Sequence, residues 1–151
     1  MKYQIIALTL LAIVLSHNAQ ANDAAKNLFT NYIQLSDTFD PAVANLYADN
    51  AKIHVYRKYP HGTERAMELS GAQWKQLLIR AMPLAKAQND KSIFSNIAIT
   101  KYNKGYKIKA NRYSNRKCYT DSGYYMVVAL NTSGKLIIIE EYSETQPQSD
   151  C

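Results

Sequence analysis

The sequence NLYADNAKIHV, residues 45–55, is followed by LSGAQWKQLL, residues 69–78, and these two stretches set the architecture. In the first, Leu46 and Tyr47 end a short helical segment, and polar and apolar residues then alternate as in a strand with one buried face. In the second, Ser70 precedes a run with helical spacing and can cap a helix. The stretches predict a short helix, a strand and a longer helix in succession.

The flanking sequence predicts the other elements. Asp23 can cap a first helix that ends near residue 37, and Asp40 with Pro41 fits the start of the short helix. Helices in the first half and strands in the second predict an α+β fold with an antiparallel sheet. Strand patterns cover residues 66–69, 93–101, 106–114, 119–130 and 135–145, with hairpin turns at 102–105 and 131–134.

The N-terminus has the residue order of a secretory signal peptide, residues 1–21. Lys2 is followed by an apolar run and by small residues, so we expect cleavage after Ala21. The apolar run is shorter than the roughly 20 residues of a membrane-spanning helix, so no stable membrane anchor is expected after cleavage; an uncleaved anchor is the alternative. The prediction is a secreted or periplasmic protein with one domain, residues 22–145, and a flexible tail, residues 146–151.

The chain is basic, with 18 Lys and Arg residues against 12 Asp and Glu residues. An excess of this size favours acidic ligands or surfaces without implying nucleic acid. The basic residues between 101 and 117 either meet nucleic acid or anionic lipid headgroups, or form a solvated sheet face. Export and the lack of a binding motif favour the solvated face, so no nucleic-acid partner is expected.

The two cysteines, Cys118 and Cys151, would both reach an oxidising compartment after export. If residues 131–134 turn a hairpin, Cys118 faces roughly position 148, within reach of the tail that ends at Cys151. We therefore expect a Cys118–Cys151 disulfide, with two free or mixed-disulfide thiols as the alternative.

These motifs resemble the nuclear transport factor 2-like superfamily, which includes SnoaL-like and ketosteroid isomerase-like proteins. The resemblance covers nearly the whole mature chain and rests on residues 46–49 (LYAD), on Ser70–Gly71 and on residues 134–142. It implies a cone-shaped, strongly bent antiparallel sheet wrapped around N-terminal helices, the cystatin-like α+β roll. The superfamily includes isomerases, dehydratases, cyclases, ligand carriers and assembly domains, so an activity has to be argued from the site.

The ketosteroid isomerase branch offers the sharpest comparison of site residues. Its site looks like a helical tyrosine and a protonated aspartic acid that donate to an oxyanion, with an aspartate as the base. The resemblance places Tyr32 at the tyrosine, Val55 at the base and Met126 at the second acid. Valine and methionine cannot hold or transfer a proton, so this chemistry is not expected.

The same alignment predicts an apolar cone with few polar groups. Arg112 and Glu141 stand out because a buried charge needs a partner or a ligand. They either orient or act on a ligand, with Tyr32 as a further catalytic candidate, or form a salt bridge at the mouth of the cone. The predicted pocket residues are Tyr32, Val55, Trp74, Tyr106, Ile108, Arg112, Tyr124, Met126, Ile139 and Glu141.

No metal or cofactor is expected. The three histidines have no metal-ligand spacing, and the cysteines form no paired motif. The sequence also lacks a nucleophile elbow and a phosphate-binding loop.

The last hairpin is apolar on both faces. Tyr125, Val127 and Ile138 are expected on the outer face, away from the helices. A sheet face without helices of its own needs another cover, so we predict a homodimer packed through this face.

Together, these features favour an exported domain that binds a small apolar or amphipathic molecule in its cone, without established catalysis. One alternative is a SnoaL-like cyclase, dehydratase or isomerase that uses Arg112, Glu141 and Tyr32. A further alternative is a dimeric assembly or partner-binding domain whose cone is filled by its own side chains.

Overall fold

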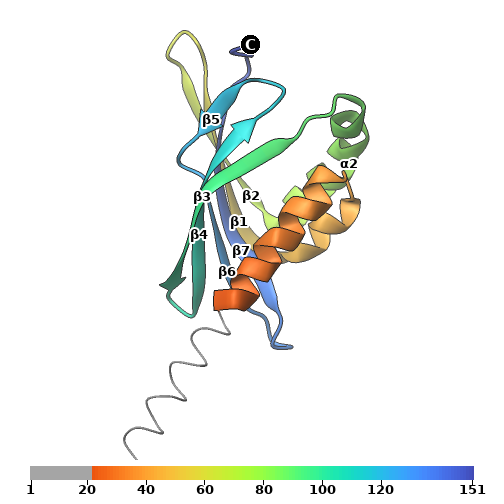
Figure 1. Cartoon of the computed structure of the whole chain (residues 1–151), viewed down its shortest axis with the longest axis vertical. Helices are drawn as coiled ribbons and strands as arrows, with labels where there is room; N and C mark the ends of the chain where they lie inside the picture. Colours follow the sequence, from red (N-terminus) through yellow and green to blue (C-terminus); the bar gives the residue numbers. More distant parts are fainter. Residues whose placement is uncertain (1–21) are drawn as a thin grey trace, which may run out of the picture.

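The computed structural model describes residues 22–151, so the predictions for residues 1–21, the signal peptide among them, lie outside the described part. The described chain is α+β, with helices and a seven-stranded sheet, which confirms the predicted fold class (Figure 1). Within residues 22–151, no helix is long and apolar enough to cross a membrane.

Three helical segments accompany the sheet. The N-terminal helix covers residues 22–37, the 3-10 helix η1 covers Pro41–Leu46, and α2 covers Gly71–Ala87. The side chain of Asp40 accepts a hydrogen bond of 2.8 Å from the Ala42 N–H and caps η1 as predicted. Pro41 suits the first helical position because its missing N–H is not needed there.

The start of α2 is fixed by a capping box. The Ser70 hydroxyl accepts from the Gln73 N–H at 3.3 Å, and the Gln73 side chain accepts from the Ser70 N–H at 2.9 Å. Gly71 brings the helix against β1 (Tyr47–Lys58), since a Cβ at this position would lie 1.8 Å from the Ala48 carbonyl oxygen. The Ser70–Gly71 pair therefore sets both the start of α2 and its approach to the sheet.

The sheet is mixed rather than purely antiparallel. Its strand order is β2-β1-β7-β6-β4-β3, β5 pairs with β4, and β1 runs parallel to β7. The other strand pairs are antiparallel. The remaining strands are β2 (Glu64–Ser70), β3 (Ser92–Tyr102), β4 (Gly105–Ser114), β5 (Tyr119–Asp121), β6 (Tyr125–Leu130) and β7 (Leu136–Thr145).

The strand predicted over residues 119–130 is two strands. The Asp121 carboxylate accepts a hydrogen bond of 2.9 Å from the Gly123 N–H, which turns the chain between β5 and β6. The turns predicted at residues 102–105 and 131–134 join β3 to β4 and β6 to β7.

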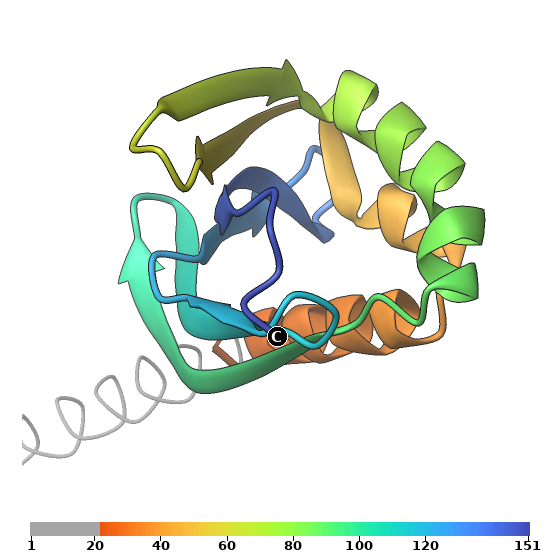
Figure 2. The same cartoon turned by 90° about the horizontal axis from the view of Figure 1, so that it is seen from above.

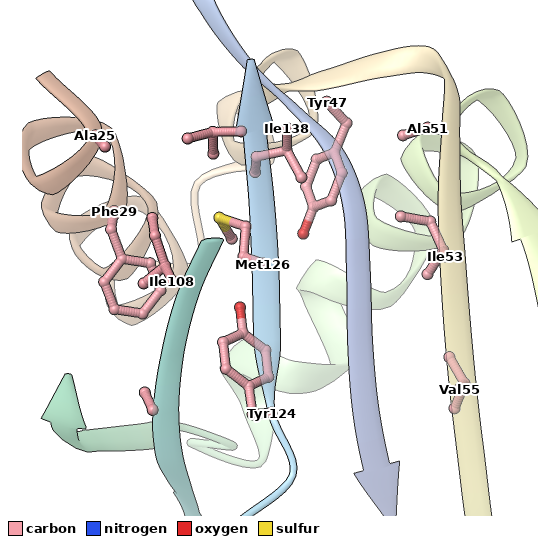
Figure 3. Packing of buried hydrophobic residues seen from close by; sticks show 12 residues of the cluster. Ala25, Phe29, Tyr47, Ala51, Ile53, Val55, Ile108, Tyr124, Met126 and Ile138 are labelled. Carbon is pink, nitrogen blue, oxygen red and sulfur yellow. The ribbon is translucent and has the colours of Figure 1, made fainter. Parts of the chain in front are cut away.

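The sheet curls around an interior that the N-terminal helix and α2 close on the open side (Figure 2). The core fills this interior with side chains from the helices and the strands. Phe29 of the N-terminal helix, Ile53 of β1, Ile108 of β4 and Met126 of β6 are among its buried members (Figure 3).

A β-bulge reverses the predicted inside and outside positions at the start of β7, before Glu140. Val127 faces Glu140 and Val128 faces Ile138, so Ile139 is the extra residue. The prediction that Ile138 lies outside and Ile139 lines the pocket is therefore wrong. Ile138 is 0% exposed and belongs to the core, whereas Ile139 is 37% exposed and borders a hollow on the outer face of the sheet.

The predicted disulfide between Cys118 and Cys151 is present, with 5.4 Å between the Cα atoms. It joins the end of residues 146–151 to the loop between β4 and β5. The Lys117 ammonium donates to the Gln146 carbonyl at 2.7 Å, and the Asp150 N–H donates to the Lys117 carbonyl at 2.8 Å. The tail thus has no helix or strand, but contacts at both of its ends hold it against the domain. Export to an oxidising compartment remains a prediction.

Candidate functional site

The polar centre of the cone is a buried carboxylate bound by three tyrosines. Glu141 of β7 is 4% exposed. Its Oε1 accepts hydrogen bonds from the hydroxyls of Tyr124 at 2.7 Å and Tyr32 at 3.2 Å, and its Oε2 accepts from the Tyr47 hydroxyl at 2.5 Å. We call these four residues the Tyr–Glu centre.

The centre joins elements that are far apart in the sequence. Tyr32 comes from the N-terminal helix, Tyr47 begins β1, and Tyr124 directly precedes β6. Figure 3 shows the Tyr47 and Tyr124 hydroxyls directed toward each other, and Met126 and Ile108 form apolar surroundings beside them. The centre is therefore a small polar group inside an apolar cone.

The three tyrosines of the centre keep their protons at neutral pH. Burial raises the pKa of Glu141, although the Tyr47 and Tyr124 hydroxyls and the Arg112 charge act in the opposite direction. Burial and the nearby Glu141 charge also raise the pKa of Tyr32, Tyr47 and Tyr124. The three phenols accordingly remain donors at neutral pH, and Glu141 is their shared acceptor.

Arg112 of β4 forms its ion pair with Asp121, at 3.5 Å, and not with Glu141. Its Nη2 also donates to the Glu144 carbonyl at 2.9 Å, and its guanidinium lies 5.8 Å from the centroid of the Tyr124 ring. The Asp121 carboxylate accepts from the Glu144 N–H at 2.8 Å. Of the two sequence alternatives, the Arg112–Glu141 salt bridge is thus absent, and each charge has other partners.

Two buried N–H donors have no hydrogen-bond partner within residues 22–151: Arg112 Nε and Trp74 Nε1. Trp74 of α2 packs against the core. Burial and the Glu141 charge raise the pKa of Tyr47, and the Trp74 side chain acts in the opposite direction. Unpartnered buried donors are uncommon, so these two are open positions for an acceptor.

One side of α2 faces the interior but is only partly buried. Trp74, Leu78 and Met82 follow one another at helical spacing on α2, and all three are only partly buried. Trp74 and Leu78 touch the core, so this side of α2 faces the interior. A hollow of about 240 Å³ also adjoins Val55 between β1 and β2. Partial exposure of residues that face inward is consistent with room for a ligand.

The structure brings together most of the predicted pocket residues. Tyr32, Tyr124 and Glu141 form the centre, and Arg112 lies beside it. The predicted apolar residues Val55, Ile108 and Met126 are core members, Tyr106 and Trp74 pack against them, and Ile139 lies elsewhere, as described above.

Two residues of the site escaped the sequence prediction. Tyr47 was assigned to the end of a helix, yet it begins β1 and donates to Glu141. Asp121 was assigned to a continuous strand, and the Asp-Ser-Gly turn sequence that it begins was the available signal. In the part of the chain described, no group of three or more His, Cys, Asp or Glu side chains could hold a metal ion.

No protein-family model and no curated protein matches the sequence. Solved structures do resemble it. A nuclear transport factor 2-like protein with a cystatin-like fold from Novosphingobium aromaticivorans has a TM-score of 0.60 at 12% identity, covering 95% of this chain and 92% of its own.

Two further structures agree. A nuclear transport factor 2-like protein of unknown function from Pseudomonas putida KT2440 has a TM-score of 0.62 at 10% identity, covering 83% of this chain and 87% of its own. A nuclear transport factor 2-like protein from Cytophaga hutchinsonii has a TM-score of 0.57 at 14% identity, covering 82% and 96%. At these identities the likeness concerns the fold, and the chain has the nuclear transport factor 2-like, cystatin-like fold that its sequence resembles.

Proposed function

We propose that this protein binds a small amphipathic molecule inside its cone. The apolar part of the ligand lies against the strands and α2, and its polar group lies at the Tyr–Glu centre. The observation that carries this proposal is the buried Glu141 with its three tyrosine donors, next to the unpartnered N–H groups of Arg112 and Trp74.

A purely structural role explains the centre less well. A buried carboxylate loses its hydration, and apolar side chains of similar volume often stabilise a core as well or better. Each unpartnered N–H costs about 1–3 kcal/mol. A core that only has to be filled gains nothing from these groups, whereas a ligand can use them.

Catalysis by proton transfer is supported less than binding. A general base needs a lone pair within hydrogen-bond reach of the substrate. Both oxygens of Glu141 already accept from tyrosines, at 2.5 to 3.2 Å. Arg112, the other candidate, is engaged by Asp121 and by the Glu144 carbonyl. The enzyme alternative would require these contacts to rearrange when the substrate binds.

The test compares two substitutions on α2 in a titration with the neutral apolar dye Nile red. Leu78→Trp adds volume on the side of α2 that packs against the core, whereas Leu77→Trp adds the same group at a side chain that is 42% exposed. We expect dye binding to the wild type and to Leu77→Trp and at least tenfold weaker binding to Leu78→Trp. Equal binding by all three would place the dye outside the cone and contradict the proposal. Native mass spectrometry of the purified protein would identify any retained molecule.

We propose in addition that a second copy of this chain covers the outer face of the sheet. A hollow of about 880 Å³ on this face is bordered by Tyr102, Val127, Ala129, Leu130 and Ile139 among others. Leu130 and Ile139 are exposed. An apolar hollow of this size on a sheet face without helices supports a protein partner.

The charges on the outer face support a second copy as that partner. Lys104, Lys107 and Lys109, in the β3–β4 turn and on β4, make one half basic. The other half carries more acidic than basic side chains. Its glutamates outnumber the lysines of β1 and are Glu64, Glu68, Glu140 and Glu144. A two-fold axis would bring the basic half of each copy onto the acidic half of the other. Sedimentation velocity should show a dimer that weakens as salt is raised; a monomer at low salt and high protein concentration would overturn this proposal.

A further inference from the structure

We infer that the ligand of the cone presents an uncharged hydroxyl group to the Tyr–Glu centre, and that carboxylate ligands are disfavoured. This inference rests on the proposed binding function and adds the chemical class of the ligand. It follows from a count of the donors, acceptors and charges that the centre offers.

The acceptors at the centre are the oxygens of the tyrosines and of Glu141. Each tyrosine hydroxyl has one proton, and all three protons point to Glu141. Toward a ligand the phenol oxygens therefore offer only lone pairs. The two carboxylate oxygens provide about four acceptor positions, of which the tyrosines use three. A ligand group at this point has to donate a hydrogen bond.

The donors are the two N–H groups without partners, Trp74 Nε1 and Arg112 Nε. Trp74 packs against the core that contains Tyr47 and Tyr124, and the Arg112 guanidinium lies 5.8 Å from the centroid of the Tyr124 ring. Donors without partners and acceptor oxygens thus occur in the same part of the interior. A hydroxyl group has one O–H and two lone pairs and satisfies both kinds of partner at once.

The charges argue against an anionic ligand. The Arg112 charge is balanced by Asp121, whose side chain is 0% exposed. No Lys or Arg side chain of the described residues forms an ion pair with Glu141. A ligand carboxylate would be buried beside the acidic Glu141 without a counter-charge, which is costly at low dielectric. The interior therefore selects against the anions that the basic net charge of +6 would attract to the surface.

The experiment uses two matched probes, cyclohexanemethanol and cyclohexanecarboxylate. Each is titrated into the protein of residues 22–151 at neutral pH and constant ionic strength, and binding is followed by NMR chemical-shift changes. We expect the alcohol to bind at least tenfold more tightly than the carboxylate. In Glu141→Gln the charge is removed while an acceptor remains, so the ratio should shrink. Glu140→Gln, on the same strand, alters a carboxylate that accepts from Tyr125 on the outer face and should leave the ratio unchanged.

The outcomes separate this inference from the proposed function. If Nile red binds in the cone but the carboxylate binds as tightly as the alcohol, the inference is overturned and the binding function stands. If neither probe nor the dye binds, both fail. Should Glu141→Gln not fold, Tyr124→Phe provides the second test. It removes one acceptor oxygen and should weaken alcohol binding about three- to tenfold without changing Nile red binding; an unchanged alcohol affinity would count against the inference.

Discussion

The guanidinium of Arg112 lies 3.5 Å from the carboxylate of Asp121, and the Asp121 side chain is completely buried. Asp121 also accepts hydrogen bonds from the Gly123 and Glu144 N–H groups. This ion pair joins β4 to the end of β5 and leaves Glu141 to the tyrosines. The pair is therefore a structural support beside the site, and its energetic role can be measured.

Arg112→Ala should destabilise the protein by about 3–5 kcal/mol, because it leaves a buried carboxylate without its counter-charge. Urea unfolding gives this value. The matched control is Arg116→Ala, since Arg116 lies 3.8 Å from Asp90 in an exposed ion pair. Exposed pairs contribute about 0–1 kcal/mol, so the control should lose little. Equal losses of unfolding free energy in the two variants would show that the Arg112–Asp121 pair stabilises the protein no more than an exposed ion pair does.

Glu141 should make the wild type less stable as the pH rises. Burial raises its pKa above 4.5 in the folded protein, so between the two pKa values the folded state binds more protons than the unfolded state. Stability contributed by this group is full below about pH 4.5 and falls as the pH rises through the folded pKa. Urea unfolding from about pH 4 to pH 7 should show the wild type losing stability relative to Glu141→Gln.

Asp121 also has a raised pKa, chiefly because of its burial, and adds a slope of the same sign. It is present in both proteins, so its contribution cancels in their difference. A difference between wild type and Glu141→Gln that is constant with pH, or that changes in the opposite direction, would be incompatible with the raised pKa of Glu141.

The order of the elements could be predicted because it depends on neighbours in the sequence. The caps at Asp40 and Ser70 and the turns at residues 102–105 and 131–134 involve contacts across only a few residues. The centre was partly predictable for a similar reason. Glu141 and Arg112 are charged residues in strands with an apolar face, and such residues stand out from the sequence pattern alone.

The remaining features depend on pairing between distant segments. The bulge that reverses Ile138 and Ile139 arises where β7 meets β6, and the sequence of β7 by itself fits either register. The partners of Glu141 and of Arg112 were missed because Tyr47 and Asp121 reach them through the folded sheet, and Tyr47 is 94 residues from Glu141. Local alternation contains no information about such contacts.

The two neighbouring isoleucines of β7 should respond in opposite ways to lysine. Ile138→Lys puts a charge into the core and should prevent folding or cost several kcal/mol. Ile139→Lys places the charge beside the outer hollow and should leave a folded monomer. Circular dichroism and sedimentation velocity distinguish these results. An Ile138→Lys protein as stable as the wild type in urea unfolding would contradict the bulge, and a dimer of unchanged strength in Ile139→Lys would exclude this face as the interface.

Removing the disulfide should lower stability without changing the fold. Cys118 and Cys151 are 33 residues apart. Closing a loop of that length lowers the entropy of the unfolded chain and so stabilises the folded state by about 3–4 kcal/mol. The double variant Cys118→Ser/Cys151→Ser, which leaves no unpaired thiol, should lose this amount in urea unfolding. The sheet and the Tyr–Glu centre should persist, because the tail adds no strand to the sheet and none of its residues contacts Glu141 by a hydrogen bond. A loss below about 1 kcal/mol would mean that the contacts of Lys117 with Gln146 and Asp150 already hold the tail in place.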